Sequence, residues 1–351
     1  MGLQVATSED GHILTGAADA TGELVNGFLA HLTTRNFSPA TRRAYAFDLL
    51  NFLRFLMERR LGLADVAPTD LFDYLDWQQQ PQKNSGGTVV RLTSRTGAAP
   101  ATMNRRIAAV RSLYDYAVIA GAVNENPVPA ARRSSGFRAM RRGLLGHLGK
   151  GRERGGGNLV REAKRLPFAL DPAQVAVFIA DLLTARDRSM ALLMLLGGLR
   201  ASEVRLLPLA NVDFGLRRVR VKGKGGKERV VPVDPSFFTE LASYLRTERP
   251  AGCTARECFV VLRGPTTGRA LTEAGLRRIF RTHRLRAGTP LVRPHRLRHT
   301  YGTELAAAGI DLLVLRDLMG HASPETTAGY VHLSATTLAE EYAAARSRLE
   351  S

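Results

Sequence analysis

The sequence predicts a mainly α-helical protein of two domains, with a small antiparallel β-sheet in the second domain. The chain has 351 residues, 44% of them hydrophobic, which is enough for two cores of ordinary size. Apolar residues recur at helical spacing in both halves, whereas the strict alternation typical of strands is confined to residues 218–233. A Gly-rich, basic stretch lies between the halves and indicates where they are joined.

The first domain is expected over residues 20–130, after an N-terminal tail over 1–19. Apolar residues recur there at spacings of three and four, the pattern of helices that bury one face. Ser38 followed by Pro39 is a start signal, because a serine side chain caps a helix and proline suits its first turn. Four helices are predicted in this domain, at about 24–32, 39–56, 69–80 and 101–120.

Half of the net charge lies in one stretch of the chain. The chain holds 50 Lys and Arg against 32 Asp and Glu, a formal net charge of +18. Residues 131–165 alone hold eleven basic and two acidic side chains, a local balance of +9, together with eight glycines. Gly-rich chain of like charge is flexible and repels itself. We therefore interpret 131–165 as a basic linker between the domains rather than a surface loop within one domain.

The second domain is expected over residues 166–333, followed by a C-terminal tail helix over 334–351. Val219 and Val221 alternate with basic residues, and the Gly-rich stretch 222–227 supplies a turn before valines return, which is the pattern of a β-hairpin. Seven helices are predicted around this hairpin, at about 172–183, 188–196, 235–246, 272–284, 295–308, 311–319 and 324–332.

The composition narrows the class of protein. A net charge of +18 exceeds what solubility requires, so a polyanionic partner is expected, most often nucleic acid. The two cysteines, Cys253 and Cys258, cannot form a disulfide framework, which favours a reducing, cytoplasmic setting. The most apolar run, Met190–Leu199, is far shorter than the roughly 20 residues of a membrane span. The first residues lack the pattern of a secretory signal, and no membrane association is expected.

The histidines indicate a site in the last part of the chain, because five of the eight fall within 283–332. His295 and Arg298 lie three residues apart and share one face of a predicted helix. Glycine turn signals after this helix would let the following helices fold back onto it. Arg200 follows an apolar helix and two glycines, where a charged side chain is poorly solvated unless it meets an anion. The candidate set is Arg200, a lysine of the 222–227 turn, His295, Arg298, His321 and Tyr330.

This set combines a phenol with several cationic donors and contains no pair of carboxylates. It suits attack on a phosphodiester, whose transition state gathers negative charge on the nonbridging oxygens. A free tyrosine has a pKa of about 10, so forming its phenolate at pH 7 costs about 4 kcal/mol, which several nearby cations can offset.

Metal chemistry fits the same residues less well. His295 and His299 are spaced as zinc ligands on a helix, yet the glutamate of a metalloprotease motif is missing between them. The two cysteines lack a second pair of ligands. A metal-dependent nuclease would need clustered carboxylates. We therefore expect no metal and no other cofactor.

Four blocks of the second domain, in order, resemble the tyrosine recombinase, or phage integrase, family. They are GLRASEV at 198–204, KGKGGKERVVPV at 222–233, HRLRHTYGTEL at 295–305 and LMGHASPETTAGYVH at 318–332. In the first domain, SPATRRAY at 38–45 and ATMNRRIAAVRSLYDYA at 101–117 resemble the core-binding domain of that family. The resemblance covers most of the chain, apart from the tails and the basic linker.

The resemblance implies a role for each matched residue. Tyr330 would attack the scissile phosphate, forming a 3′-phosphotyrosine and freeing a 5′-hydroxyl. Arg200 and Arg298 would clamp the nonbridging oxygens, and His321 would add a hydrogen bond to the phosphate. Lys224 would protonate the leaving 5′-oxygen. Neither a metal nor ATP would be required, because the phosphotyrosine keeps the energy of the broken diester.

The remaining implications concern supporting residues, shape and assembly. His295 would act as a base or orient Tyr330, and Glu203 and His299 would support the site, unless they are ordinary polar groups of their helices. The fold would be a C-shaped clamp, made of a helical core-binding domain and a mixed α+β catalytic domain. The partner would be double-stranded DNA, with a dimer on one site and a homo-tetramer on two duplexes. Accessory recombination proteins and a bacterial, nucleoid-associated location also follow from the resemblance.

DNA contacts are predicted on the polar faces of two helices of the first domain. Arginines there would contact phosphates, which position a protein without reading the base sequence. An ordinary solvated face remains the alternative for each of them. The residues concerned are Arg42, Arg43, Arg105, Arg106 and Arg111.

The predicted function is that of a site-specific DNA recombinase or integrase, including the transposase of a mobile element. Two alternatives stay open on sequence grounds. One is a non-catalytic DNA-binding regulator that retains the fold, and the other is a topoisomerase of the type IB kind. The complete set of six matched residues favours the enzyme over the regulator.

Overall fold

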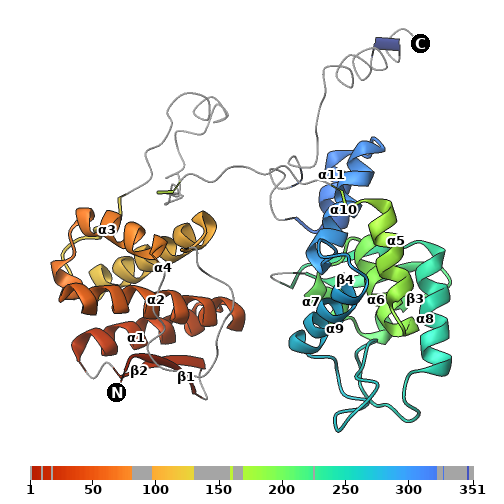
Figure 1. Cartoon of the computed structure of the whole chain (residues 1–351), viewed down its shortest axis with the longest axis horizontal. Coiled ribbons are helices and arrows are strands. Elements are labelled where there is room, and N and C mark those ends of the chain that lie inside the picture. The colour runs from red at the N-terminus through yellow and green to blue at the C-terminus, as the bar shows by residue number, and fades with distance from the viewer. Residues whose placement is uncertain are drawn as a thin grey trace. The chain divides into compact units, whose positions relative to one another are not determined.

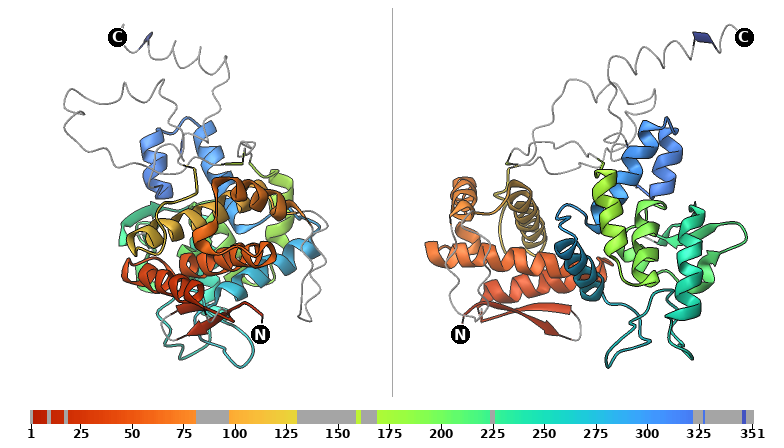
Figure 2. Two further views of the ribbon diagram at one scale, coloured as in Figure 1. Left: turned by 90° about the vertical axis from the view of Figure 1, so that its left-hand side faces the viewer. Right: turned by 45° about the vertical axis from the view of Figure 1, so that its right-hand side comes forward.

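The computed structural model describes residues 2–8, 11–16, 19–80, 97–129, 159–160, 169–223, 226–321, 327 and 346–347. The chain divides into two compact units, Met1–Lys164 and Arg165–Ser351, each with its own hydrophobic core. In the described residues both units are mostly helical, and each carries one small antiparallel sheet (Figures 1 and 2). The predicted fold class is therefore confirmed, while the C-shaped clamp stays a prediction.

The first unit contains the four helices that the sequence predicts. They are α1 (Ala20–Thr34), α2 (Pro39–Arg59), α3 (Pro68–Gln79) and α4 (Pro100–Ile119). Helix α2 begins as expected, because the Ser38 hydroxyl accepts a hydrogen bond from the backbone N–H of Thr41 at 3.2 Å and Pro39 opens the first turn.

Aromatic side chains join α2 to α3. The ring centroids of Phe52 and Tyr74 lie 5.1 Å apart, and those of Phe55 and Trp77 lie 5.8 Å apart, in both cases edge to face. This geometry places the positive edge of one ring on the negative face of the other, an attraction that adds to the stabilisation gained by burying both rings. The centre of the first unit is therefore an aromatic core that orients α2, on which α4 also packs.

The predicted tail over 1–19 is wrong for most of its length, because a β-hairpin forms there. Strands β1 (Gln4–Ser8) and β2 (Gly11–Thr15) pair in antiparallel fashion and pack on α1 and α2 (Figure 1). The hairpin buries Leu3 and Leu14, and Asn26 of α1 exchanges two hydrogen bonds with the backbone of Leu14. Two buried leucines are too few to give this stretch the alternating pattern of a strand. The hairpin is instead stabilised by contacts with α1, which follows it in the sequence.

Replacing Leu14 with alanine is expected to destabilise the first unit by about 2–4 kcal/mol, since Leu14 is only 2% exposed and a cavity would remain. Ile13→Ala is the matched control, because its neighbour in the same strand is 36% exposed. Denaturant titration of both variants measures the difference. Equal, small losses would show that the hairpin contributes nothing to this core.

Two residues of the predicted linker pack against the first unit. The backbone N–H of Val160 donates to the Asn104 side-chain oxygen at 3.0 Å, and the amide nitrogen of Asn104 donates to the Val160 carbonyl at 2.9 Å. Leu159 and Val160 are half-buried against the core that contains α4. This part of 131–165 is thus tied to the first unit rather than solvated, and most of the remaining linker lies outside the described residues.

In the described residues, the second unit is built from seven α-helices, one 3-10 turn and three strands. The helices are α5 (Pro172–Asp181), α6 (Ala185–Leu195), α7 (Ala201–Arg205), α8 (Pro235–Thr247), α9 (Glu273–Arg286), α10 (Pro294–Ala307) and α11 (Leu312–Met319), with a 3-10 turn at Leu209–Asn211. The strands are β3 (Val212–Asp213), β4 (Arg218–Lys222) and β5 (Glu228–Pro232), in the sheet order β3-β4-β5.

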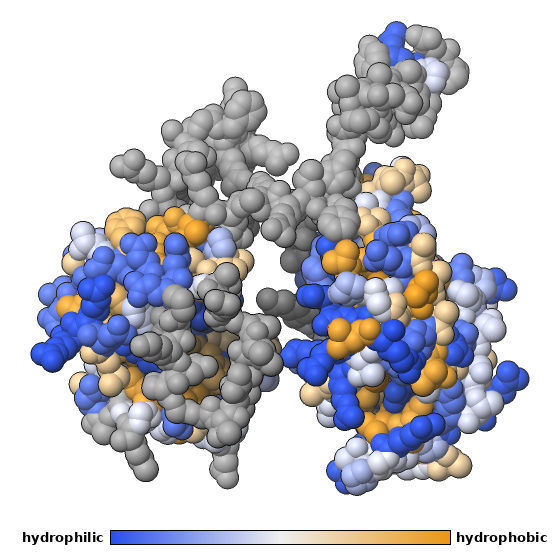
Figure 3. Space-filling model, viewed as in Figure 1, coloured by the Kyte–Doolittle hydropathy of each residue, from blue (hydrophilic) through white to orange (hydrophobic). Residues whose placement is uncertain are grey.

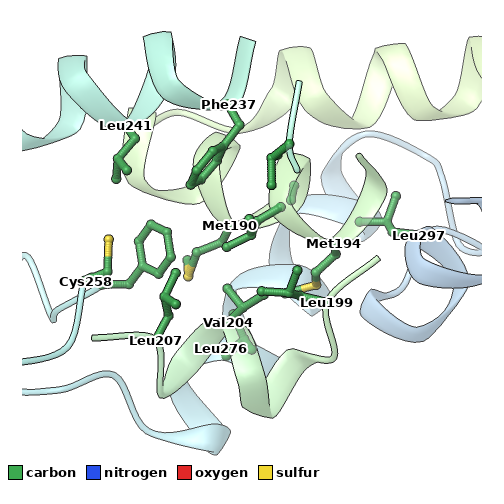
Figure 4. Close-up of a cluster of buried hydrophobic side chains, with 14 of the residues drawn as sticks. Met190, Met194, Leu199, Val204, Leu207, Phe237, Leu241, Cys258, Leu276 and Leu297 are labelled. Carbon is green, nitrogen blue, oxygen red and sulfur yellow. The ribbon is translucent and has the colours of Figure 1, made fainter. Parts of the chain in front are cut away.

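Helix α6 forms the centre of this unit. Met190 and Met194 of α6 are fully buried and meet Phe237 of α8 and Leu297 of α10 in the cluster shown in Figure 4. A helix that buries apolar side chains all round lies in the core rather than on its surface. Helices α8 and α10 therefore pack on α6, and α10 gains a rigid base for the residues of the candidate site.

The predicted hairpin is confirmed as β4 and β5, in which Val219 pairs with Val231 and Lys222 with Glu228. The valines of β4 are buried and its basic residues are exposed, whereas Arg229 of β5 is only 12% exposed. The helix predicted over 324–332 and the tail helix over 334–351 lie almost wholly outside the described residues.

On the side seen in Figure 3, apolar residues form small patches among hydrophilic ones on both units. Among the residues that the structure describes, no helix is long and apolar enough to span a bilayer.

Candidate active site

A buried carboxylate organises the predicted site. Glu203 lies in the first turn of α7, where one of its oxygens accepts the backbone N–H of Arg200 at 2.8 Å and the other accepts the Arg200 guanidinium at 2.8 Å. Arg229 of β5 donates to both oxygens, at 2.9 and 2.8 Å. Burial raises the pKa of Glu203, but these hydrogen bonds and charges outweigh it and hold the pKa below its usual range. Glu203 is therefore ionised at neutral pH.

Arg298 meets the same carboxylate from a distant block of sequence. Its side chain is only 6% exposed, and its Nη1 atom lies 3.9 Å from a Glu203 oxygen. Nη1 also donates to the Gly198 carbonyl, and Nη2 donates to the Met319 carbonyl at 2.6 Å. The structure therefore brings together Arg200 and Arg298, as the sequence predicts.

The C-terminal end of α11 is held by three arginines. The Leu318 carbonyl accepts from Arg229 and the Met319 carbonyl from Arg298, and the Gly320 carbonyl accepts from Arg200 at 2.9 Å. The last carbonyls of a helix have no partner within it and carry the negative end of its dipole, so cations stabilise them.

Gly320 is required where α11 ends. Its φ of +62° lies in the left-handed region, and a Cβ atom there would sit 2.8 Å from the Arg229 guanidinium. The chain therefore turns at Gly320 directly against the arginine cluster. This turn delivers His321, the next residue, to the same place.

The histidines of the site are held in their neutral form. Burial, followed by the charges of Arg298 and Arg200, lowers the pKa of His321 to about 4. Burial, His295 and Arg298 lower the pKa of His299 to about 4, and burial and Arg298 also lower the pKa of His295. At pH 7 each ring can therefore offer one donor and one acceptor.

Two hydrogen bonds orient these rings. Nδ1 of His321 lies 2.9 Å from the hydroxyl of the buried Thr327, and the Nε2 atoms of His295 and His299 lie 3.0 Å apart. His295 and His299 thus form a pair of neighbouring rings, in which one nitrogen must donate and the other accept. Thr327 is a partner that the sequence analysis did not identify.

Acidification from pH 7 to 4 is expected to destabilise the second unit through these histidines. The folded pKa of His321 is about 4, against 6.5 for the free side chain, so between these values the unfolded chain binds a proton that the folded chain does not. The contribution is complete above pH 6.5 and is lost as the pH falls towards 4. Denaturant titrations across this window measure it. His321→Gln should flatten the slope, and an unchanged slope would contradict the assignment.

Two members of the predicted set lie outside the described residues, namely Lys224 and Tyr330. The flanking turn is described up to Gly223, whose N–H donates to the Lys227 carbonyl at 2.8 Å. The roles of Lys224 and Tyr330 therefore stay predictions.

The arginines predicted to contact DNA in the first unit make contacts within the protein. Arg105 forms an ion pair with the buried Asp48, and Arg106 donates to the Gln78 side chain at 3.1 Å. Arg111 donates to the Pro129 carbonyl at 3.0 Å. These contacts fix the directions of the three side chains on α4.

The two arginines of α2 also contact neighbouring side chains. Arg42 donates to the Thr33 hydroxyl at 2.5 Å. Arg43 is exposed and lies over the Phe47 ring at 5.0 Å from its centroid. The predicted DNA contacts of these five arginines remain proposals.

Helix α9 and the nearby Arg293 carry a basic surface that was not predicted from the sequence. Arg278, Arg281 and Arg293 are exposed, and the single acid of α9, Glu273, pairs with Arg277. Burial and the charges of Arg293 and Arg281 lower the pKa of Arg284. Closely spaced arginines that repel one another are stabilised by an anion. The run of basic residues in 277–286 is the sequence signal that could have predicted this surface.

Arg229 was also not predicted as a site residue, although it lies within the block KGKGGKERVVPV that resembles the family. Its position in a strand next to a charged turn made it look like one more solvated cation. The structure instead buries it to 12% exposure against Glu203.

Both units of the chain match known protein families. Residues 169–337 match the Phage integrase family, and residues 25–121 match the N-terminal SAM-like domain of phage integrases. Tyrosine recombinase XerC of Myxococcus xanthus is 31% identical over 340 residues, which cover 93% of this chain and 98% of the relative. Tyrosine recombinase XerC of Pelobacter propionicus is 29% identical over 327 residues, covering 91% and 94%.

Solved structures agree on the fold. The XerH site-specific recombinase bound to its difH substrate has a TM-score of 0.58 at 20% identity, covering 90% of this chain and 82% of that one. The Tn1549 transposon integrase in complex with circular intermediate DNA has a TM-score of 0.61 at 16% identity, covering 91% and 98%. Together with the family matches and the XerC relatives, this fold places the chain in the phage integrase family of tyrosine recombinases, enzymes that cleave and rejoin DNA strands.

Proposed function

We propose that this recombinase acts at specific DNA sites through a 3′-phosphotyrosine on Tyr330, without a metal ion or ATP. The observation that carries the proposal is the convergence of Arg200 and Arg298 on the end of α11, directly before His321. Planar guanidinium groups donate in pairs and match the nonbridging oxygens of a phosphate. Two fixed cations at that point supply the charge that a metal would otherwise supply.

In the proposed reaction, the Tyr330 oxygen forms a bond to the scissile phosphorus while the bond to the 5′-oxygen breaks. Lys224 gives a proton to that leaving oxygen. Arg200, Arg298 and the neutral His321 hydrogen-bond the phosphate oxygens as charge develops on them. A 5′-hydroxyl later attacks the phosphotyrosine, which restores both the diester and the tyrosine, so no ATP is consumed.

The supporting residues of the site receive distinct roles in this proposal. His295 accepts the Tyr330 proton or orients the phenol, because a lowered pKa leaves its ring neutral and able to accept. His299 fixes the His295 ring through their contact. Glu203 holds the Arg200 guanidinium in place.

We further propose that the partner is double-stranded DNA, bound by a dimer at one site and by a tetramer that joins two duplexes. The net charge of +18 and the basic linker support a polyanionic partner. Recombination exchanges strands between two sites, so four active chains are required for four strands. Accessory proteins and a cytoplasmic, nucleoid-associated location in bacteria complete the proposal.

We also propose that α9 contacts the DNA backbone. Arg281→Ala and Arg278→Ala are each expected to weaken binding across all sequences and to reduce the slope of log affinity against log salt by about one unit. Fluorescence anisotropy at several salt concentrations measures the slope. Arg188→Ala is a suitable control, because Arg188 is paired with Glu240. Unchanged slopes for both α9 variants would remove this helix from the interface.

The proposal is tested by trapping the covalent intermediate. The protein is mixed with a pool of nicked duplexes that carry a randomised core, and covalent complexes are recovered from a denaturing gel. The expected result is an EDTA-insensitive adduct whose peptide map places the phosphate on Tyr330. Sequencing of the trapped DNA then gives the target site.

The same experiment separates the alternatives. Selective binding of a sequence without any covalent adduct would favour the non-catalytic regulator and overturn the proposal. Relaxation of a supercoiled plasmid with no selected sequence would favour the topoisomerase. An adduct that disappears with EDTA would contradict the metal-free mechanism.

A further inference from the structure

Arg229 ties three elements of the second unit together. Its Nε atom donates to the Leu318 carbonyl of α11 at 2.8 Å, while both terminal nitrogens donate to Glu203 of α7. Arg229 itself belongs to β5, the strand that follows the turn containing Lys224. A planar guanidinium can make a paired contact with a carboxylate through its two terminal nitrogens and still reach a third acceptor with its Nε–H.

The acceptor positions of Glu203 are shared between two arginines. A carboxylate offers about four lone-pair positions, and Arg229 takes one on each oxygen. The guanidinium and the backbone N–H of Arg200 occupy one further position on each oxygen. Glu203 is thereby held in one orientation, with Arg298 at 3.9 Å rather than in a close pair.

The charge balance of this cluster depends on Arg229. The cluster contains three positive charges, on Arg200, Arg298 and Arg229, and one negative charge, on Glu203. Its net charge of two positive units is available to bind a phosphate. Without Arg229 the balance falls to one. Glu203 would also lose the partner that holds both of its oxygens, so it could turn to form a paired contact with Arg200 at 2.8 Å or with Arg298 at 3.9 Å.

We propose that Arg229 is a positioning residue for strand cleavage, which neutralises and orients Glu203 so that Arg200 and Arg298 keep their charge for the scissile phosphate. This inference rests on the proposed function. Arg229 acts through Glu203 and through the end of α11, and it does not itself contact DNA. Its side chain is only 12% exposed, in keeping with that role.

The decisive test is a double-mutant cycle on the rate of covalent-complex formation at saturating DNA. Arg229→Gln is expected to slow cleavage by about 10- to 100-fold, which corresponds to the contribution of a hydrogen bond to a charged group. Adding Glu203→Gln removes the charge that Arg229 compensates, so the double variant should cleave several-fold faster than Arg229→Gln alone. Arg229→Lys keeps the charge but loses the paired contact, and its rate should fall between those of wild type and Arg229→Gln.

Controls separate this role from simple destabilisation. Arg188 makes the same kind of contact elsewhere in the unit, to the Glu240 carboxylate and the Leu182 carbonyl. Arg188→Gln should lose thermal stability without a change in cleavage rate. DNA affinity of the Arg229 variants should stay within about threefold of wild type, because the DNA-contacting surfaces are unaltered.

The possible outcomes are distinct. A double variant as slow as Arg229→Gln, or slower, would overturn the inference while the proposed function stands. Wild-type rates for Arg229→Gln would do the same. If Arg229→Gln fails to fold, the comparison of Arg229→Lys with and without Glu203→Gln decides the question in the same way. A wild-type protein that forms no Tyr330-dependent adduct would overturn both the inference and the proposed function.

Discussion

Tyr330→Phe will form no detectable covalent complex with DNA, while its DNA affinity stays within about twofold of wild type. Phenylalanine keeps the ring but lacks the oxygen that forms the bond to phosphorus, so the chemical step has no nucleophile. Loss of a covalent nucleophile lowers turnover by at least about 10⁴-fold in enzymes where its partners act as a unit with it.

The measurement pairs a denaturing gel with a binding assay on the same nicked duplex. Tyr301→Phe provides the comparison, because the charges of Arg229 and Arg298 act on Tyr301. Burial raises the pKa of Tyr301, which makes its phenol a poor nucleophile. A covalent band that persists in Tyr330→Phe and disappears in Tyr301→Phe would reverse the assignment of the nucleophile.

Arg298→Gln is expected to reduce the cleavage rate by about 10³-fold and to destabilise the second unit by about 1–3 kcal/mol. The catalytic loss follows from removing one fixed cation from a phosphate whose charge rises in the transition state. The loss of stability follows because the Gly198 and Met319 carbonyls lose their donors in a buried place.

Rates at saturating DNA and denaturant titrations distinguish these two effects. Arg186→Gln is the matched control, since Arg186 is as buried as Arg298 and binds Asp187 and the Val260 carbonyl away from the site. It should show the structural loss alone. Equal effects of the two variants on cleavage would show that Arg298 has no specific part in the reaction.

Local sequence signals predicted most of the fold because they depend on neighbours along the chain. Ser38 and Pro39 define the start of α2, and the alternation around Val219 defines the hairpin, whichever tertiary structure surrounds them. The N-terminal hairpin was missed for the opposite reason. Its burial depends on Asn26 and on α1 and α2, which no pattern within residues 1–19 reveals.

In the candidate site, the structure places Arg200, Arg298 and His321 together at the end of α11, while the roles assigned to them stay predictions. The spacing of His295 and Arg298 on one helix, and the motifs that resemble the family, identified Arg200 and His321 as their partners. Arg229 and Thr327 were missed, because nothing in their local sequence distinguishes a buried partner from a solvated polar residue. Lys224 and Tyr330 rest on the motifs alone.

The sequence by itself therefore determined the class of fold, the polyanionic partner and the residues suited to phosphate chemistry, since composition, periodicity and motif spacing are properties of the chain. Only the tertiary structure decided which charges are paired with one another. Glu203, Arg229 and the end of α11 come from three distant segments, and they meet because α11 packs on both α10 and β5, while α7 and α10 pack on α6. Electrostatic energy depends on distance and burial, and neither exists until the chain has folded.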